Sequence, residues 1–135
     1  MAKESGLGMT VAVDDAGGTA RTISNDITNL QWTMPSDVQD ITGVNSSGME
    51  RLLLLADFTV TLNGVTNFAA NQSHDVLKDV GVSSVTRTVT LTHSGQILET
   101  EDLINDYVVQ RPADGSRIWS ASGVLNETVV PAWTT

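Results

Sequence analysis

The segment RLLLLADFTVTL at residues 51–62 carries the strongest secondary-structure signal in the chain. Every second residue from Leu52 to Leu62 is apolar, and this period of two predicts a β-strand with one face on a core. The opposite face begins with leucines and becomes polar from Asp57 onward, so one end of the strand is expected to be covered on both sides. The pair Asn63-Gly64 predicts a turn directly after it.

Six shorter segments also alternate between apolar and polar residues and are bounded by turn residues, which predicts further strands. They are residues 9–14, 19–24, 84–92, 96–101, 106–111 and 117–123. Residues 71–80 predict the one helix, which Asn71 or Ser73 would cap and Gly81 would end. A short helical turn is expected within residues 25–30.

These elements predict a single domain over residues 1–135. Its fold class is mainly β: two packed antiparallel sheets, forming a β-sandwich or split barrel, with one flanking α-helix. An extended N-terminus (1–8), a long loop or extended hairpin (35–48) and an extended C-terminal tail (128–135) complete the chain.

The charge balance is strongly acidic. Sixteen Asp and Glu against seven Lys and Arg give a net charge of −9, the wrong sign for a protein that grips nucleic acid through its phosphates. The chain has no cysteine, which excludes disulfides and thiolate chemistry. No apolar run is long enough to span a membrane and no signal peptide is visible, so we expect a soluble protein made inside the cell.

Catalytic and metal-binding motifs are missing from the sequence. His74 and His93 lack the second histidine at i+2 or i+4 that a metal site would use. Glu99 and Glu101 would share one face of a strand, as an acid–base pair does, but an acidic solvated or lumen-facing edge is the favoured interpretation. We therefore predict neither an enzyme nor a cofactor or metal site.

The order of these elements resembles the major tail tube proteins of siphophages that infect actinobacteria, and of related prophage elements. Four segments carry the resemblance, which spans most of the chain. They are DITNLQW at 26–32, GMERL at 48–52 leading to DFTVTLNG at 57–64, the threonine-rich strand at 86–92, and DYVVQR with DGSRIWSA at 106–111 and 114–121.

The resemblance implies a structural virion protein rather than an enzyme. Subunits would form hexameric rings, with strands joining across the ring into one β-barrel around an acidic lumen. Stacked rings would form the tail tube of a phage virion, made in the cytoplasm of a bacterial host, and DNA would pass through it without specific binding. The other implied partners are the tape measure protein, the tail tip or initiator and the terminator.

The contacts between subunits are assigned to the 36–48 loop and the tail at 130–133. The residues expected to make these contacts, with Met49 directly after the loop, are Ser36, Asp37, Val38, Asp40, Ile41, Val44, Met49, Val130 and Trp133. Candidates for the acidic lumen are Asp57, Glu99 and Glu101, because each is expected on a strand and facing away from the core. Arg87 interrupts an apolar strand face and is expected to pair with an acid of its own or a neighbouring subunit.

Three alternatives stay open at this stage. Another ring-forming tail part, such as a terminator, connector or contractile-system inner tube, would also oligomerise. A carbohydrate-binding β-sandwich would be a monomer that presents Trp119 and Trp133 on a binding face. A small β-barrel hydrolase has the least support, because no catalytic set is visible.

Overall fold

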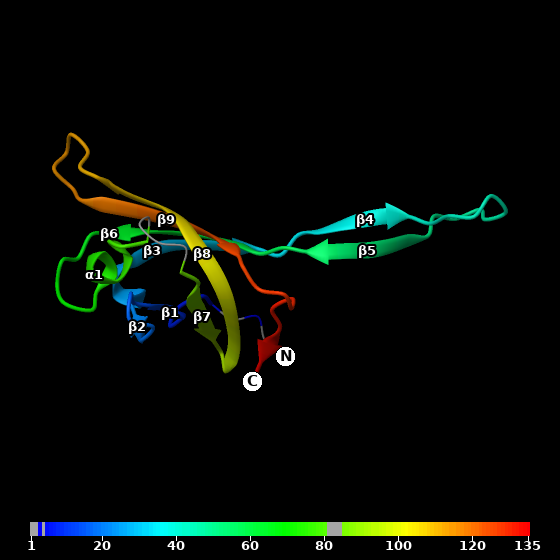
Figure 1. The fold of residues 1–135 in the computed structure, drawn as a ribbon. Coiled ribbons are helices and arrows are strands. Elements are labelled where there is room, and N and C mark those ends of the chain that lie inside the picture. The colour runs from blue at the N-terminus through cyan, green and yellow to red at the C-terminus, as the bar shows by residue number, and fades with distance from the viewer. Residues whose placement is uncertain (1–2, 4, 81–84) are drawn as a thin grey trace.

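The computed structural model describes residues 3, 5–80 and 85–135 of the chain, and Figure 1 shows their arrangement. The strands are β1 (Thr10–Asp14), β2 (Ala20–Thr22), β3 (Ile27–Thr33), β4 (Ser36–Asp40), β5 (Arg51–Ala56), β6 (Thr59–Val65), β7 (Arg87–His93), β8 (Gln96–Gln110), β9 (Ile118–Leu125) and β10 (Trp133–Thr134). The helices are a 3-10 turn, η1 (Ser24–Asp26), and α1 (Ser73–Leu77). The mainly β class with one flanking α-helix is confirmed. Neither helix among these residues has the length and apolarity needed to cross a membrane.

One antiparallel sheet holds eight strands and bends around the core (Figure 1). Its order is β2-β1-β7-β8-β9-β6-β3, and β10 also pairs with β8. Strand β8 is 15 residues long and takes part in both halves of the bend. It pairs with β7 as far as Asp102 and with β9 from Asp102 to Gln110. The result is the predicted split barrel, in which the segments 96–101 and 106–111 are parts of one strand.

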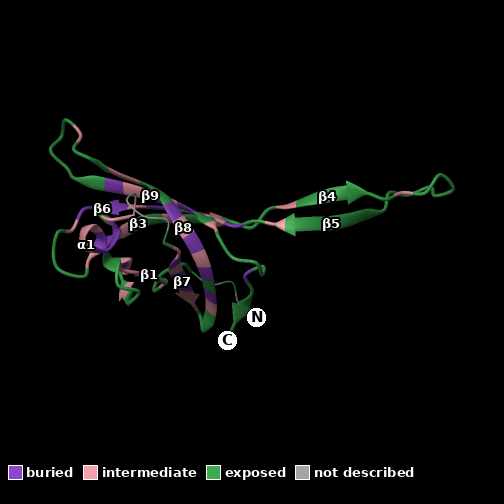
Figure 2. Ribbon diagram, viewed as in Figure 1, coloured by how far each residue is buried: buried purple, intermediate pink, exposed green. Residues whose placement is uncertain are grey.

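The core lies between the two halves of this sheet (Figure 2). Alternate residues of β1, β7 and β8 face alternate residues of β6 and β9, and α1 adds Val76 and Leu77. The buried apolar residues are Val11, Val13, Ile23, Phe58, Val60, Leu62, Val76, Leu77, Val89, Leu91, Leu98, Ile104, Trp119 and Ala121. Trp119 is only 2% exposed, and its Nε1 donates to the carbonyl oxygen of Val65 at 3.0 Å, so its one polar atom is satisfied.

The prediction of one long strand over residues 51–62 is wrong. The segment breaks at Asp57 into β5 and β6, which belong to different sheets. Asp57 N–H donates to the carbonyl oxygen of Pro35 at 2.8 Å, and its Oδ1 accepts from Phe58 N–H at 2.8 Å. These bonds turn the chain, so only the half after the turn has one face on the core. The change from two-sided to one-sided apolarity in the sequence marks this boundary.

The predicted turn at Asn63-Gly64 is also wrong, because both residues lie inside β6. Asn63 and Gly64 pair with β9 on one side and with β3 on the other. Glycine is required at this point for close approach: a Cβ on Gly64 would overlap the backbone carbonyl of Asp26 and crowd the Trp119 indole. A glycine that serves packing within a strand has the same local sequence signal as one that serves a turn.

Helix α1 is shorter than predicted, and neither Asn71 nor Ser73 caps it. Its N-cap residue is Gln72, which makes no side-chain capping bond. The buried carboxylate of Asp26 takes that role from another element: its Oδ2 accepts from the N–H of Ser73 at 3.0 Å. The expected stop at Gly81 lies outside the described residues. The helical turn expected in 25–30 is present only as η1, after which β3 begins.

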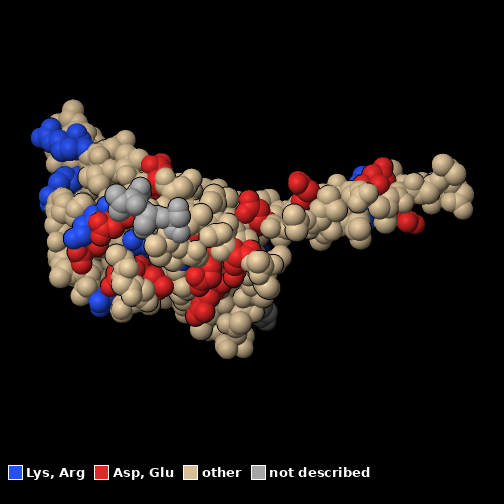
Figure 3. Space-filling view, in the orientation of Figure 1, with Lys and Arg blue, Asp and Glu red and all other residues tan. Residues whose placement is uncertain are grey.

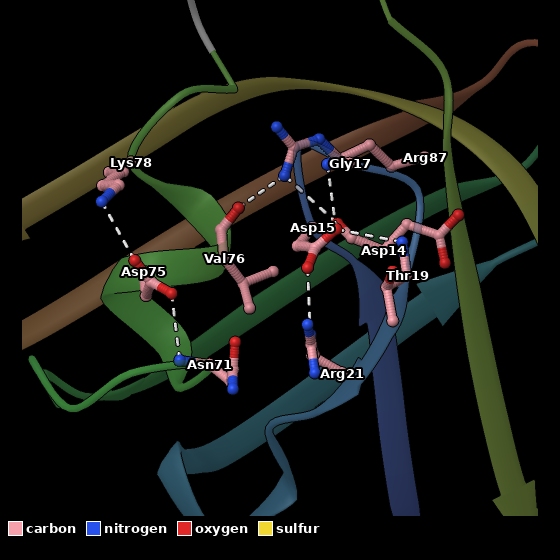
Figure 4. Close-up of polar contacts among 10 residues, drawn as sticks. All are labelled: Asp14, Asp15, Gly17, Thr19, Arg21, Asn71, Asp75, Val76, Lys78 and Arg87. Carbon is pink, nitrogen blue, oxygen red and sulfur yellow. Dashed lines mark hydrogen bonds and ion pairs between the residues drawn. The ribbon is translucent and has the colours of Figure 1, made fainter.

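Arg87 does not pair with an acid in the described part of the chain, contrary to expectation. Its buried guanidinium donates to two main-chain carbonyls, that of Asp14 at the end of β1 and that of Val76 in α1 (Figure 4). A cation suits the last turn of a helix, where carbonyl groups lack intrahelical partners. Arg87 therefore joins β7, β1 and α1 at one end of the core.

Replacement of this guanidinium by an apolar chain of similar length should cost stability. Arg87→Met leaves two inward-facing carbonyls without donors, and we expect the free energy of unfolding to fall by about 1–3 kcal/mol in urea titrations. The control is Lys78→Met, which removes an exposed pair with Asp75 (3.0 Å, Figure 4) and should leave the unfolding midpoint nearly unchanged. Equal midpoints for the two variants would show that Arg87 does not join these elements.

Candidate assembly surfaces

A two-stranded hairpin extends from the domain as a separate arm (Figure 1). Strands β4 and β5 form it, with Val38 opposite Leu53, Gln39 opposite Leu52 and Asp40 opposite Arg51. The segment predicted as a loop or extended hairpin thus contains strand β4, and the connection runs from residue 41 to 50. We call residues 36–56 the arm.

The far end of the arm is held by its own hydrogen bonds. Thr42 donates its hydroxyl to Asp40 Oδ1 at 2.6 Å, and the same hydroxyl accepts from Glu50 N–H at 2.8 Å. Together with the N–H of Thr42, the hydroxyl lowers the pKa of Asp40 by favouring its charged form. These bonds fix the turn at the far end of the arm and favour the charged form of Asp40.

Both faces of the arm are apolar and open to solvent (Figure 2). One face carries Leu53, 72% exposed, and Leu55, 91% exposed, beside Val38. The other face carries Leu52 and Leu54, each about half exposed. A monomer rarely exposes so large an apolar surface, and an isolated hairpin is marginal in water. The described residues leave both faces largely uncovered.

The structure brings most of the residues predicted for subunit contacts onto this arm. Asp37, Val38, Asp40, Ile41, Val44 and Met49 are exposed along it, and Ser36 is half-buried at its base. The prediction did not include the run from Leu52 to Leu55, which consists of four exposed leucines. The leucines on both faces of that run were the available signal. They were interpreted as one end of a strand that its own domain covers on both sides.

The C-terminal tail forms a second exposed apolar site. Trp133 pairs through β10 with Leu98 of β8, and its ring lies 6.1 Å from that of Trp32. Both Trp133 and Val130 keep an exposed surface, as predicted for contact residues. Trp119 by contrast lies in the core, so the binding face with Trp119 and Trp133 that a carbohydrate-binding module would need is not formed.

The acidic candidates divide between two places. Glu99 and Glu101 lie on the outer face of β8, opposite Thr90 and Thr88 of β7, and Thr88 Oγ1 donates to Glu101 Oε1 at 2.5 Å. Asp57 is on no strand and lies at the base of the arm, so the premise for grouping it with the other two is wrong. The β7–β8 outer face thus combines threonine hydroxyls with two carboxylates.

The described residues form no cluster of side chains that could hold a metal ion. No three side chains of His, Asp or Glu converge there as a metal site would require. His74 contacts the hydroxyl of Tyr107 at 3.1 Å and the ring of Phe68, which is a packing arrangement. The arm, the tail and the acidic face of β8 are the surfaces on which the predicted contact and lumen residues lie, apart from Asp57.

Two solved structures resemble the fold of this chain. A chain in the tail of an empty gene transfer agent (GTA) particle with C6 symmetry superimposes with a TM-score of 0.79 at 14% identity, covering 98% of this chain and 100% of that one. The chain has a tail-tube-like fold. A chain from the virion of a native GTA particle gives a TM-score of 0.77 at 13% identity, with coverage of 98% and 100%. No protein-family model and no curated protein sequence matches.

Asp102 of this fold should make stability depend on pH. Burial raises the pKa of Asp102 from 3.8 to about 6, against a hydrogen bond from Thr100 Oγ1 at 2.7 Å. Its other oxygen, Oδ1, has no partner among the described residues. Because the folded form holds the proton more tightly than the unfolded form, the stabilisation is complete below pH 3.8 and is lost as the pH rises through about 6.

The variant Asp102→Asn stays neutral and should escape this loss. The free energy of unfolding of Asp102→Asn minus that of the natural protein should increase by about 1–2 kcal/mol from pH 4 to pH 8, allowing for partial solvation. Urea titrations at both pH values measure the gain, with Asp106→Asn, an exposed acid of the same strand, as control. If the free energy of unfolding of Asp102→Asn differs from that of the natural protein by the same amount at both pH values, the raised pKa of Asp102 is contradicted.

Proposed function

We propose that this chain is the tube subunit of a phage-like tail: six copies close into a ring, rings stack into a tube, and DNA passes along the lumen. The observation that carries the proposal is the arm, a preformed hairpin with uncovered apolar side chains on both faces, on a domain with a tail-tube-like fold. Neighbouring copies would bury those faces. The role would be structural rather than enzymatic.

Open sheet edges support ring closure. Strand β3 ends the sheet order, and β8 pairs with β7 only as far as Asp102, so both strands present unpaired backbone groups within the described region. Such edges invite pairing with another copy, and a closed ring removes them. Strand pairing across copies would also continue the sheet around a central channel.

The acidic sheet face supports a lumen through which DNA slides. Glu99 and Glu101 are surrounded on β7 by threonines, and neither makes an ion pair with a described residue. In the tube this face would line the channel, where carboxylates repel phosphates and hydroxyls exchange hydrogen bonds with water. Partners such as a tape measure, tip and terminator protein would act at the ends and interior of the tube.

Electron microscopy tests the proposal directly. The purified protein, concentrated at neutral pH and imaged in negative stain, should form hollow tubes of constant width, and light scattering should rise with time. Isolated rings would instead favour a terminator or connector. A protein that stays monomeric, even beside tail-tip initiator complexes, would contradict assembly altogether.

Apolar residues on one face of the arm should be essential to assembly and dispensable for folding. Leu53→Asp with Leu55→Asp places charge where two exposed leucines would be buried by a neighbour, and we expect tube formation to fall at least about 100-fold. The thermal unfolding temperature should not fall, because neither side chain packs in the core. Sedimentation and circular dichroism measure the two properties.

The control is Val85→Asp, which changes an exposed apolar residue on the body of the domain. It should assemble like the natural protein. Normal tubes from the Leu53 and Leu55 double variant would show that this face of the arm is not an interface.

A further inference from the structure

Positive charge is concentrated at the end of the molecule opposite the arm (Figure 3). Arg111 and Arg117 flank the exposed connection between β8 and β9, which we call the tip (residues 111–117). Two other cations, Arg21 and Lys78, are held by Asp15 and Asp75. Arg111 and Arg117 make no ion pair with any described residue, so their charge is available to a partner.

The arm carries the opposite charge. Asp37, Asp40 and Glu50 are exposed on it, and its only cation is Arg51; three acids and one base give a net charge of −2. No ion pair joins these four residues to one another or to the rest of the described chain. The acids of the arm and the arginines of the tip are therefore complementary charges at opposite ends of the molecule.

The tip is ordered in a way that suits binding. Asp114 accepts from the N–H and the hydroxyl of Ser116 at 3.0 and 2.8 Å, which directs the one acid of the tip onto its own turn. Arg117 lies over the ring of Phe68, 4.7 Å from its centroid. Ile118 follows Arg117 in β9 and pairs with Val65 of β6. Phe68, Ile118 and Val65 are all exposed. An apolar surface with free arginines matches an apolar arm with free acids.

We propose that the tip of one copy is the docking site for the arm of a second copy, with Arg111 and Arg117 against Asp37 and Glu50. The inference rests on the proposed function and names the partner surface within it. Since the two surfaces lie at opposite ends of the molecule, each contact leaves one free arm and one free tip, so the same contact can repeat from copy to copy. Charge complementarity of this kind mainly sets the association rate and the pairing partner.

A charge exchange between the two surfaces tests the pairing. The first variant reverses the tip, Arg111→Glu with Arg117→Glu, and keeps the acidic arm. The second reverses the arm, Asp37→Arg with Glu50→Arg, and keeps the basic tip; Asp40 is left in place because it holds the turn. Each variant alone would bring like charges together, and its elongation rate should fall at least about tenfold.

An equimolar mixture of the two variants should recover tube growth, because each arm then meets a tip of opposite charge. A control, Lys3→Glu with Arg21→Glu, changes net charge as much as the tip variant and should elongate normally. Growth of each variant alone at the natural rate, or a mixture of folded variants that still does not grow, would overturn the pairing. Circular dichroism establishes that the variants are folded.

Salt gives a second measurement on the same variants. The control and the tip variant have equal net charge, so screening of the overall repulsion affects both alike. The ratio of the elongation rate of the control to that of the tip variant should therefore fall about tenfold between about 0.05 M and about 0.5 M NaCl, as screening shortens the reach of the arm and tip charges. A ratio independent of salt would overturn the inference while tubes still form. Absence of tubes at every salt concentration would instead contradict the proposed function, so the two failures are distinguishable.

Discussion

Strand β8 is the constraint on which the rest of the structure depends. Its first half hydrogen-bonds to β7 and its second half to β9, so one continuous strand fixes both halves of the bent sheet relative to each other. The core residues Leu98 and Ile104 lie on the same strand, one in each half. Asp102, where the partner changes, is buried, and the chain accepts an acid with a raised pKa at the bend.

The arm lies outside the main sheet. Strand β6 lies between β3 and β9 in the main sheet, whereas β5 leaves that sheet at Asp57 and joins a separate one. It pairs only with β4, and its leucines gain nothing from the core. In the proposed tube, burial of the apolar area of the arm would contribute to association rather than to folding.

The molecule is acidic in total, and its charge is also distributed unevenly along its length. The net charge of −9 repels separate copies at long range, whereas the arginines of the tip and the acids of the arm would attract each other at short range in the proposed contact. The carboxylates of β8 face outward among threonines on a surface that neither the arm nor the tip uses. Assembly and passage of DNA would thus use different parts of one acidic surface.

The sequence by itself determined the β class, most strand positions and the location of the subunit-contact candidates. Those features depend on local period and on turn residues, which neighbouring residues alone encode. The tertiary structure decided that residues 51–62 divide at Asp57, that Gly64 packs inside a strand, and that Asp26 rather than a local residue caps α1. It also decided that Leu52 to Leu55 face solvent and that Arg87 binds carbonyls. An apolar run has the same sequence whether its own core or another copy buries it, because burial depends on residues far away in the chain or in another molecule.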